Sequence, residues 1–477
     1  MAVLAGLAPL AVLECLCRFA GWGQISEATD PYVGFSEIHP LFERNAKGDR
    51  YEIAKSRLSL FYPDSFAAAK HPGEFRIFCL GGSTVQGSPY TIETSFTTWL
   101  ELSLQAAAPS RRWEVVNCGG LSYASYRLVP ILKEVLGYGA DMVILYTGHN
   151  EFLEERSYEH VQRTPRWVAR AHAWCTRFRL YNACRRGWLQ LQESLGVSRS
   201  APATRLPPDV DARLDSWGGL EAYHRDDAWR EAAVQHYEFN LGRMVTMAAA
   251  AGVPLVLVNP VSNLKDCPPF KVESDSRLPE DRRAEFDRLW RAAREMPEAR
   301  AYDRIELLER ALAIDGRHAG AQFMLGRCYL RVAEVAQAKE AFVRAKDEDT
   351  CPLRMLESMH QALRRVAAAS GTPLVDARRL FESFNPDGIP GEELLLDHVH
   401  PSIRGHQLIA GALLGEVMRL AAVHPRPGWE ARRDLLYRRQ LERLEAPYFV
   451  RGRERLDGQR KWTQGRAFRQ VRRVQER

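Results

Sequence analysis

The sequence predicts an α/β fold in which a parallel sheet is covered by helices on both faces. Apolar runs of strand length alternate with helical patterns along much of the chain. Several of these runs end directly in turns of small or polar residues, as strands do where a parallel sheet gives way to a helix. The chain has 477 residues, and one core rarely exceeds about 250–300 residues, so two or three domains are expected.

Strands and helices are expected to alternate along the domain that holds this sheet. The predicted elements are a strand at 75–80, a helix at 93–107, a strand at 113–118, a helix at 125–137, a strand at 141–147, a helix at 229–251, strands at 254–259 and 372–376, and a last helix at 403–421. Residues 23–70 are mixed, with 30–35 and 58–63 as short extended candidates. We interpret them as a lead-in that packs on the domain.

A serine follows the first predicted strand directly, in Gly81-Gly82-Ser83-Thr84-Val85-Gln86-Gly87. The carboxyl edge of an open α/β sheet is where ligands bind. No Lys-Ser/Thr pair follows Gly87 and no G-x-G-x-x-G is present, so the phosphate-binding loop and the dinucleotide fingerprint are both excluded. The nucleophile elbow G-x-S-x-G fails as well, because Val85 occupies its second glycine position. This serine therefore needs a base from elsewhere in the chain.

That base can come from the downstream loop Asp397-His398-Val399-His400-Pro401-Ser402. A serine hydroxyl is a poor nucleophile until a base takes its proton, and the base needs an orienting acceptor on its other ring nitrogen. An Asp three residues before a His supplies both from one loop. Two further segments end predicted strands between the serine and this loop, namely Asn117-Cys118-Gly119-Gly120-Leu121-Ser122 and Gly148-His149-Asn150-Glu151.

These four blocks, in this order, resemble the SGNH/GDSL hydrolase family, whose blocks are G-D-S, a glycine turn, G-x-N-D and D-x-x-H. The resemblance covers roughly residues 70–160 and 250–420. It implies a flavodoxin-like three-layer parallel sheet and a serine esterase or acyl hydrolase. Ser83 would be the nucleophile, His400 the base and Asp397 the residue that orients the base. The family chemistry needs no metal and no cofactor, and the nine cysteines show no metal-ligand spacing.

The sequence departs from the family pattern at three positions. Gly82 replaces the Asp of G-D-S, and Glu151 replaces the Asp of G-x-N-D. Counted from Asn117, the family's oxyanion glycine falls on Ser122. These departures bear on substrate range and on oxyanion geometry, because the nucleophile, the base and the Asn amide are all retained.

The resemblance implies three donors for the oxyanion. They are the backbone N–H of Ser83, the backbone N–H of Ser122 and the side-chain amide of Asn150. Ser122 can serve in place of glycine if its φ is negative, and Gly120 is the alternative if the turn is shifted by two residues.

Two other functions are compatible with the same sequence. In an O-acyltransferase, a glycan hydroxyl instead of water would resolve the acyl-serine, as in some membrane-associated members of the family. In a scaffold protein, the hydrolase site would be vestigial and a helical insert would bind a protein partner. The expected substrate is an ester-bearing small molecule, lipid or glycan, and nucleic acid is not expected.

The chain begins with an apolar run, and we interpret residues 1–22 as a membrane anchor or signal segment. We expect the catalytic domain to lie on the extracytoplasmic side of the membrane. The alternative is a buried N-terminal helix of a soluble protein. No basic region precedes the run and no small-residue cleavage site follows it.

The remaining chain divides into an α/β domain at 23–279 and 367–424, interrupted by a helical insert at 280–366. The insert matches tetratricopeptide spacing at Leu325, Gly326, Tyr329, Ala338, Phe342 and Ala345. It holds about one and a half repeats, which is too few to stand alone, so its helices are expected to lean on the domain.

Two basic segments complete the division. Residues 160–190 interleave arginines with aromatic residues, which fits either a membrane-interface helix or a helix that covers the core. Residues 425–477 form a basic tail; 16 Lys and Arg against seven Asp and Glu lie in 426–477. This tail fits either a helix at an anionic membrane surface or a solvated tail.

Overall fold

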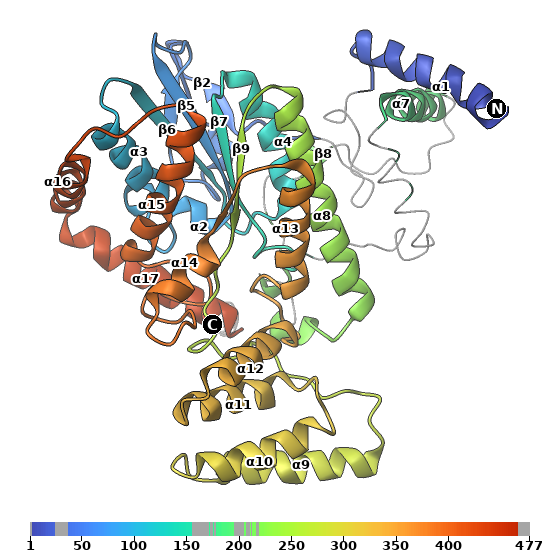
Figure 1. Cartoon of the computed structure of the whole chain (residues 1–477), viewed down its shortest axis with the longest axis vertical. Helices are drawn as coiled ribbons and strands as arrows, with labels where there is room; N and C mark the ends of the chain where they lie inside the picture. Colours follow the sequence, from blue (N-terminus) through green and yellow to red (C-terminus); the bar gives the residue numbers. More distant parts are fainter. Residues whose placement is uncertain are drawn as a thin grey trace, which may run out of the picture.

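The computed structural model describes residues 2–23, 37–154, 178–194, 205–206, 212–215 and 219–465, together with positions 171, 175 and 210. Its central element is a five-stranded sheet in the order β10-β9-β7-β5-β6, and all neighbouring strands are parallel (Figure 1). In chain order this is 2-1-3-4-5, the flavodoxin-like doubly wound topology, so the predicted fold class is confirmed. The strands are β5 (Glu74–Gly81), β6 (Arg112–Gly119), β7 (Met142–Tyr146), β9 (Leu255–Asn259) and β10 (Leu374–Asp376).

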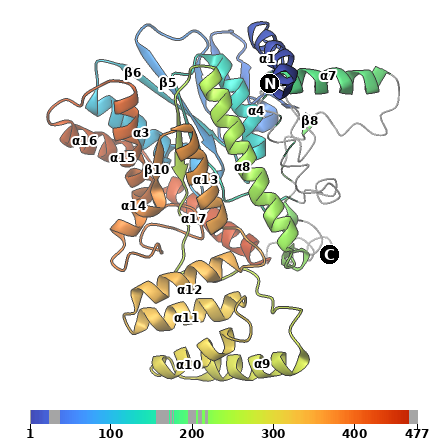
Figure 2. The same cartoon turned by 45° about the vertical axis from the view of Figure 1, so that its right-hand side comes forward.

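Helices cover both faces of the sheet, as Figures 1 and 2 show. One face carries α4 (Ser125–Val135), α8 (Asp227–Ala250) and α13 (Glu357–Ser370); the other carries α3 (Phe96–Ala107) and α15 (Ile403–Leu420). Successive strand residues point to opposite faces. Phe78 and Leu80 of β5 therefore pack in one buried cluster, and Ile77 and Cys79 pack in the other. The near-continuous apolar strands follow from this double coverage.

The lead-in forms a small antiparallel sheet that the sequence reading missed. Its strands are β2 (Phe42–Arg44), β3 (Arg50–Ile53) and β4 (Ser65–Ala67). The extended candidate at 58–63 is not a strand, because only one bridge forms there, between Phe61 and Gly120. Phe42 and Phe66 instead pack edge-on against Phe78 of the central sheet. The other candidate, 30–35, lies outside the described residues.

The helical insert lies beyond the carboxyl edge of the sheet (Figure 1). It consists of α9 (Glu280–Glu295), α10 (Ala301–Leu312), α11 (Ala319–Arg331) and α12 (Val335–Asp347). Phe342 and Ala338 of α12 share a buried cluster with Leu264 and Ile389 of the α/β domain, so the insert leans on that domain. Helix α13, placed in the insert by sequence, packs on α8 instead. Assignment of α9–α12 to the tetratricopeptide family stays a prediction.

The described part of the basic tail is folded onto the domain. It forms α16 (Trp429–Glu442) and α17 (Ala446–Thr463). The Tyr437 hydroxyl lies 2.7 Å from Ser103 Oγ of α3, which fixes α16. Helix α17 crosses the carboxyl edge, from Tyr448 beside Thr94 to Trp462 beside Asp215 (2.8 and 2.6 Å). Residues 429–463 therefore pack on the domain and are not a free solvated tail, whereas a membrane-surface role for them stays a prediction; 466–477 lie outside the described residues.

The N-terminal helix α1 (Ala2–Phe19) contacts α7 (Arg179–Ser194). Glu14 accepts hydrogen bonds from the backbone N–H groups of Arg179 (3.1 Å) and Leu180 (2.9 Å) and so caps α7. Within the described part of the chain, no helix combines the length and the apolar character needed to cross a membrane. Of the basic segment 160–190, most of its first half lies outside the described residues, whereas 179–190 belong to α7.

Candidate active site

Ser83 occupies the strand-to-helix turn that the sequence indicates. It is the first residue of α2 (Ser83–Gln86), immediately after β5, and Gly82 is the N-cap with extended backbone. The first N–H groups of a helix have no partner within the helix. The backbone N–H of Ser83 is therefore available to a ligand at the carboxyl edge. Ser83 is 8% exposed, so its hydroxyl lies in a largely dry environment.

His400 and Asp397 lie on the loop that precedes α15 and meet this serine. His400 Nε2 is 2.7 Å from Ser83 Oγ, and His400 Nδ1 is 2.7 Å from Asp397 Oδ2. Asp397 Oδ1 also accepts hydrogen bonds from the backbone N–H groups of Val399 (2.9 Å) and His400 (2.8 Å). The carboxylate favours the tautomer in which Nδ1 carries the proton and Nε2 accepts one from the serine. The three predicted residues thus form one connected chain.

Asp397 is held in its ionised form. Burial alone would raise its pKa, but the adjacent His400 and His398 imidazoles and the hydrogen bonds from the loop bring the pKa well below its usual range. The carboxylate therefore remains charged at neutral pH and keeps its hold on the imidazole.

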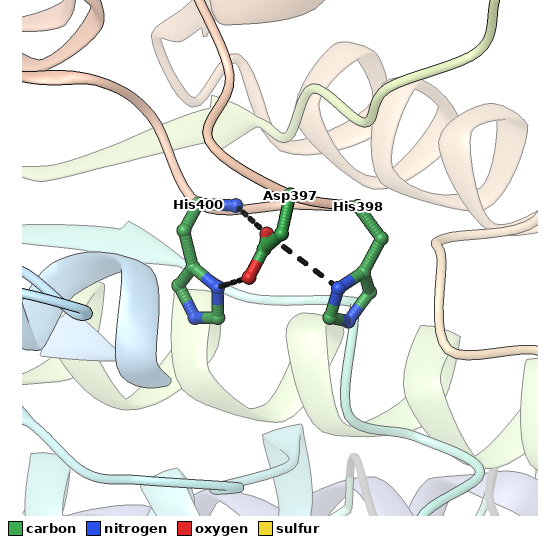
Figure 3. A group of neighbouring side chains, drawn as sticks. All are labelled: Asp397, His398 and His400. Carbon is green, nitrogen blue, oxygen red and sulfur yellow. Dashed lines mark hydrogen bonds and ion pairs between the residues drawn. The ribbon is translucent and has the colours of Figure 1, made fainter. Parts of the chain in front are cut away.

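His398 is a member of the site that the sequence reading did not single out. Figure 3 shows the Asp397 carboxylate between two imidazoles, with His398 opposite His400. His398 Nδ1 lies 3.5 Å from Asp397 Oδ1, and its ring packs edge-on against Phe270 at 5.3 Å between centroids. Burial lowers the pKa of His398 to about 4, so it is neutral at pH 7. A second His in the same loop, two residues before the base, was the available signal.

These three side chains also satisfy the spacing of a metal-ligand group, because their ligand atoms lie within 4.8 Å of one another. In the observed arrangement, however, His400 Nδ1 and Asp397 Oδ2 already bond each other, and Asp397 Oδ1 accepts two backbone hydrogen bonds. Because the Asp397 and His400 atoms are engaged in these hydrogen bonds, the three side chains fit a proton-transfer chain and are not available as a set of metal ligands.

The backbone N–H groups of the turn after β6 differ in whether they have a hydrogen-bond acceptor. The Gly120 N–H donates to Gly81 O (3.0 Å), the Leu121 N–H to Leu60 O (2.8 Å) and the Tyr123 N–H to Gly120 O (3.2 Å). Among the described residues, none accepts a hydrogen bond from the Ser122 N–H. The alternative donor, Gly120, is therefore already used in extending the sheet, and the geometry favours Ser122.

The condition of a negative φ at Ser122 is wrong, because its φ is +63°, although its backbone N–H still has no acceptor among the described residues. This left-handed conformation is the one that glycine adopts without cost, which explains a glycine at this position in the family pattern. Ser122 takes the same turn at the expense of backbone strain.

Asn150 lies against the nucleophile turn. Its side-chain Nδ2 donates to Tyr123 O (3.0 Å), which joins the third block to the second. A Cβ atom built on Gly82 would lie 2.5 Å from Asn150 Nδ2, closer than any real contact allows. The amide of Asn150 thus occupies the space that a side chain at position 82 would need. The absence of a side chain at Gly82 therefore leaves the space in which the Asn150 amide lies.

The departure at Glu151 has a local structural partner. Glu151 accepts hydrogen bonds from the backbone N–H (2.6 Å) and the hydroxyl (2.9 Å) of Ser125, the first residue of α4. It therefore fixes the start of α4 and the end of the Ser122 turn. Asn117, which the sequence reading used only for counting, donates through Nδ2 to Val85 O (2.7 Å) and to Thr97 Oγ1 (2.9 Å). It holds β6 against α2 and α3.

No protein-family model and no curated protein matches the chain. Solved structures to which the chain is similar include an α/β hydrolase enzyme from the metagenome of Lake Arreo, Spain (15% identity, TM-score 0.32, 74% of this chain and 98% of that one). Others are the lipase/acylhydrolase from Enterococcus faecalis (13%, 0.33, 74% and 100%) and an acetylxylan esterase from Geobacillus stearothermophilus (13%, 0.33, 73% and 96%). Identities and scores this low carry no argument about activity, which depends on the side chains described above.

The strained turn gives a prediction about stability. Replacing Ser122 with Gly removes the left-handed strain, so the free energy of unfolding in urea is expected to rise by about 0.5–1 kcal/mol. Ser122→Ala keeps the Cβ atom and should unfold like the parent chain. A Gly variant that is no more stable than the parent would contradict the assigned backbone conformation.

Proposed function

We propose that the chain is a serine hydrolase of the SGNH type that cleaves carboxylic esters through an acyl-serine. One observation carries this proposal: the unbroken series from Ser83 Oγ through His400 to Asp397, with 2.7 Å at each of its two contacts. A nucleophile, a base within hydrogen-bond reach and a buried group that orients the base are the arrangement that acyl transfer to serine requires.

The reaction follows from these contacts. As Ser83 Oγ attacks the acyl carbonyl carbon, its proton passes to His400 Nε2, and the carbonyl oxygen becomes an oxyanion. When the tetrahedral intermediate collapses, the C–O bond to the alcohol breaks and His400 returns the proton to the leaving alcohol. Water then attacks the acyl-serine by the same route and releases the acid. Asp397 stabilises the imidazolium at each stage.

Negative charge on the oxyanion needs donors that are in place before the reaction. We assign this role to the backbone N–H groups of Ser83 and Ser122 and to the side-chain amide of Asn150. Each such donor can contribute about 3 kcal/mol to the transition state in a dry site. The free Ser122 N–H and the contact between Asn150 and the Gly82 turn support the assignment.

An acyltransferase would use the same acyl-serine, with a glycan hydroxyl in place of water. A vestigial site would instead have lost one of the three residues or their contacts. The intact contacts of Ser83 and His400 favour an active enzyme over a scaffold. Ester hydrolysis is the simpler proposal, and transfer is decided by adding a glycan acceptor to the assay and comparing acylated glycan with free acid.

The central test is covalent labelling of Ser83. A fluorophosphonate probe should label the parent chain at Ser83, and Ser83→Ala should lose both labelling and hydrolysis of p-nitrophenyl acetate, by at least about 10³-fold in rate. Ser88→Ala, a change at another buried serine nearby, is the control that should retain both. Normal turnover by Ser83→Ala would rule out the proposal.

A second prediction concerns the departure from G-D-S. Restoring the family's residue by Gly82→Asp should lower kcat by about 10–100-fold with little change in KM, because the new side chain displaces the Asn150 amide. Gly137→Asp is the matched control, since a Cβ atom there would meet nothing within 4 Å. If Gly82→Asp has parent activity, Asn150 does not depend on the glycine.

We also propose that the chain attaches to a membrane through residues 1–22, with the catalytic domain on the extracytoplasmic side. Glu14 faces α7, while Leu16, Phe19 and Trp22 expose 57%, 96% and 66% of their surface. Exposed apolar residues on one helix are suited to a lipid surface.

Fractionation tests this attachment. The full chain should be recovered with membranes at low salt, and the chain without residues 1–22 should be recovered in the soluble fraction. Phe19→Glu should weaken attachment, whereas Tyr302→Glu, at another exposed aromatic residue, on the insert (75%), should not. Complete recovery of the full chain in the soluble fraction would contradict the proposal.

A further inference from the structure

The segment that joins the helical insert back to the α/β domain is buried under the catalytic edge. It runs from Lys346, in the last turn of α12, to Leu356, the residue before α13. Lys346, Cys351, Met355 and Leu356 are each at most 2% exposed. A linker between two bodies normally runs over the surface. This one passes instead between the loops that carry the proposed site residues.

Met355 supports the loop that carries Asn150. Its backbone N–H donates to His149 Nδ1 (3.3 Å), and its carbonyl accepts a hydrogen bond from the buried Lys346 Nζ (2.6 Å). Its Sδ lies 2.6 Å from the position of a Cβ atom on Gly148, whose φ is +139°. Only glycine allows this approach, so Met355 packs directly on the backbone two residues before Asn150.

Arg354 and Asp349 support the loop after β9 in the same way. Arg354 Nη1 donates to Asn263 O (2.9 Å) and Cys267 O (2.7 Å), and Asp349 accepts from the Phe270 N–H (2.8 Å). The Asn263 N–H in turn donates to the carbonyl of His398, on the loop of the base (2.9 Å). The linker therefore contacts the loop of the oxyanion amide directly and the loop of the base through one intermediate residue.

Asn150 depends on this support, because its only side-chain hydrogen bond among the described residues goes to Tyr123 O. Its direction is otherwise set by the backbone of residues 148–150. An oxyanion donor is effective only when it is aimed before the reaction starts, and a displacement of about 1 Å can cost 10²-fold in rate. The packing of Met355 against Gly148 therefore helps to fix the direction of the Asn150 amide.

We propose that Met355 and Lys346 are positioning residues for the Asn150 amide, so that the helical insert controls the oxyanion hole through its return segment. This inference depends on the proposed ester hydrolysis and extends it. Among the described residues, neither has a hydrogen bond or ion pair with Ser83, His400 or Asp397. Their effect must pass through residues 148–150.

A double-mutant cycle on the full chain tests the inference. Asn150→Ala alone should lower kcat for p-nitrophenyl acetate by about 10²–10³-fold. Met355→Ala should lower kcat by about tenfold with KM changed less than twofold, and Met355→Leu, which conserves volume, should restore most of the rate. The combination Met355→Ala with Asn150→Ala should be no more than about twofold slower than Asn150→Ala, because the amide that Met355 aims is already absent.

Met359→Ala is the matched control, since Met359 is also fully buried in the same cluster but lies on α13. It should destabilise the chain comparably and change kcat less than twofold. If Met355→Ala fails to fold, Lys346→Met removes the hydrogen bond to Met355 O, together with the ion pair to Asp347, while keeping the side chain's length. Lys339→Met is its control, because it removes the ion pair between Glu382 and another lysine of α12, which is partly buried.

The outcomes separate this inference from the proposed function. No turnover and no Ser83 labelling in the parent chain would refute the function. An active parent in which the Met355→Ala and Asn150→Ala effects multiply, or in which Met359→Ala matches Met355→Ala, would refute the positioning role. Non-additive loss confined to the Met355 and Lys346 variants would support it.

Discussion

His400 Nε2 lies 2.7 Å from Ser83 Oγ, and this contact joins two loops that are 317 residues apart in the chain. Such a contact persists only if both loops are fixed by their own surroundings. The serine follows β5, which pairs along its length with β6 and with β7 on its other side. The loop of the base is held by backbone hydrogen bonds from Leu396 N–H to His400 O and from Ser402 N–H to Leu394 O, each 2.8 Å. The imidazole is thereby in place without help from a substrate.

Elements outside the sheet surround this contact from opposite sides. Helix α17 meets the segment after the nucleophile through Arg455 Nε, which donates to Pro89 O (2.6 Å), and meets the loop of the base through Arg460 Nη2, which donates to Leu396 O (2.6 Å). The return segment of the insert approaches from the other side, at Gly148. The α/β domain alone therefore does not define the environment of the site. Helix α17 and the return segment of the insert also contact the loops of the site.

Much of the fold and of the candidate site could be predicted from sequence. A physical reason separates the features that could be predicted from those that could not. The strands and Ser83 were predictable because a buried strand and the turn after it are local features. Asp397 and His400 were assigned through the resemblance to a family with four ordered blocks. The sheet of β2–β4 was missed because its strands are only three or four residues long.

The supports of the site were missed for a different reason. Arg354 and α17 act through contacts between distant parts of the chain, which no local pattern records. Ser122 illustrates the limit well. Its offset from Asn117 points to Ser122 as a donor, but the sign of its φ depends on the bonds that Gly120 and Leu121 make to other segments.

The order of these parts along the chain has a consequence for synthesis. Chains emerge from the ribosome at about 5–20 residues per second, so His400 follows Ser83 after roughly 15–60 s. During that interval the serine has no base, and α17 emerges later still. An emerging chain thus carries its nucleophile in an inert form until the 317 residues that separate it from the base have been made. The separation of nucleophile and base along the chain delays any chemistry until both loops have been synthesised and have folded together.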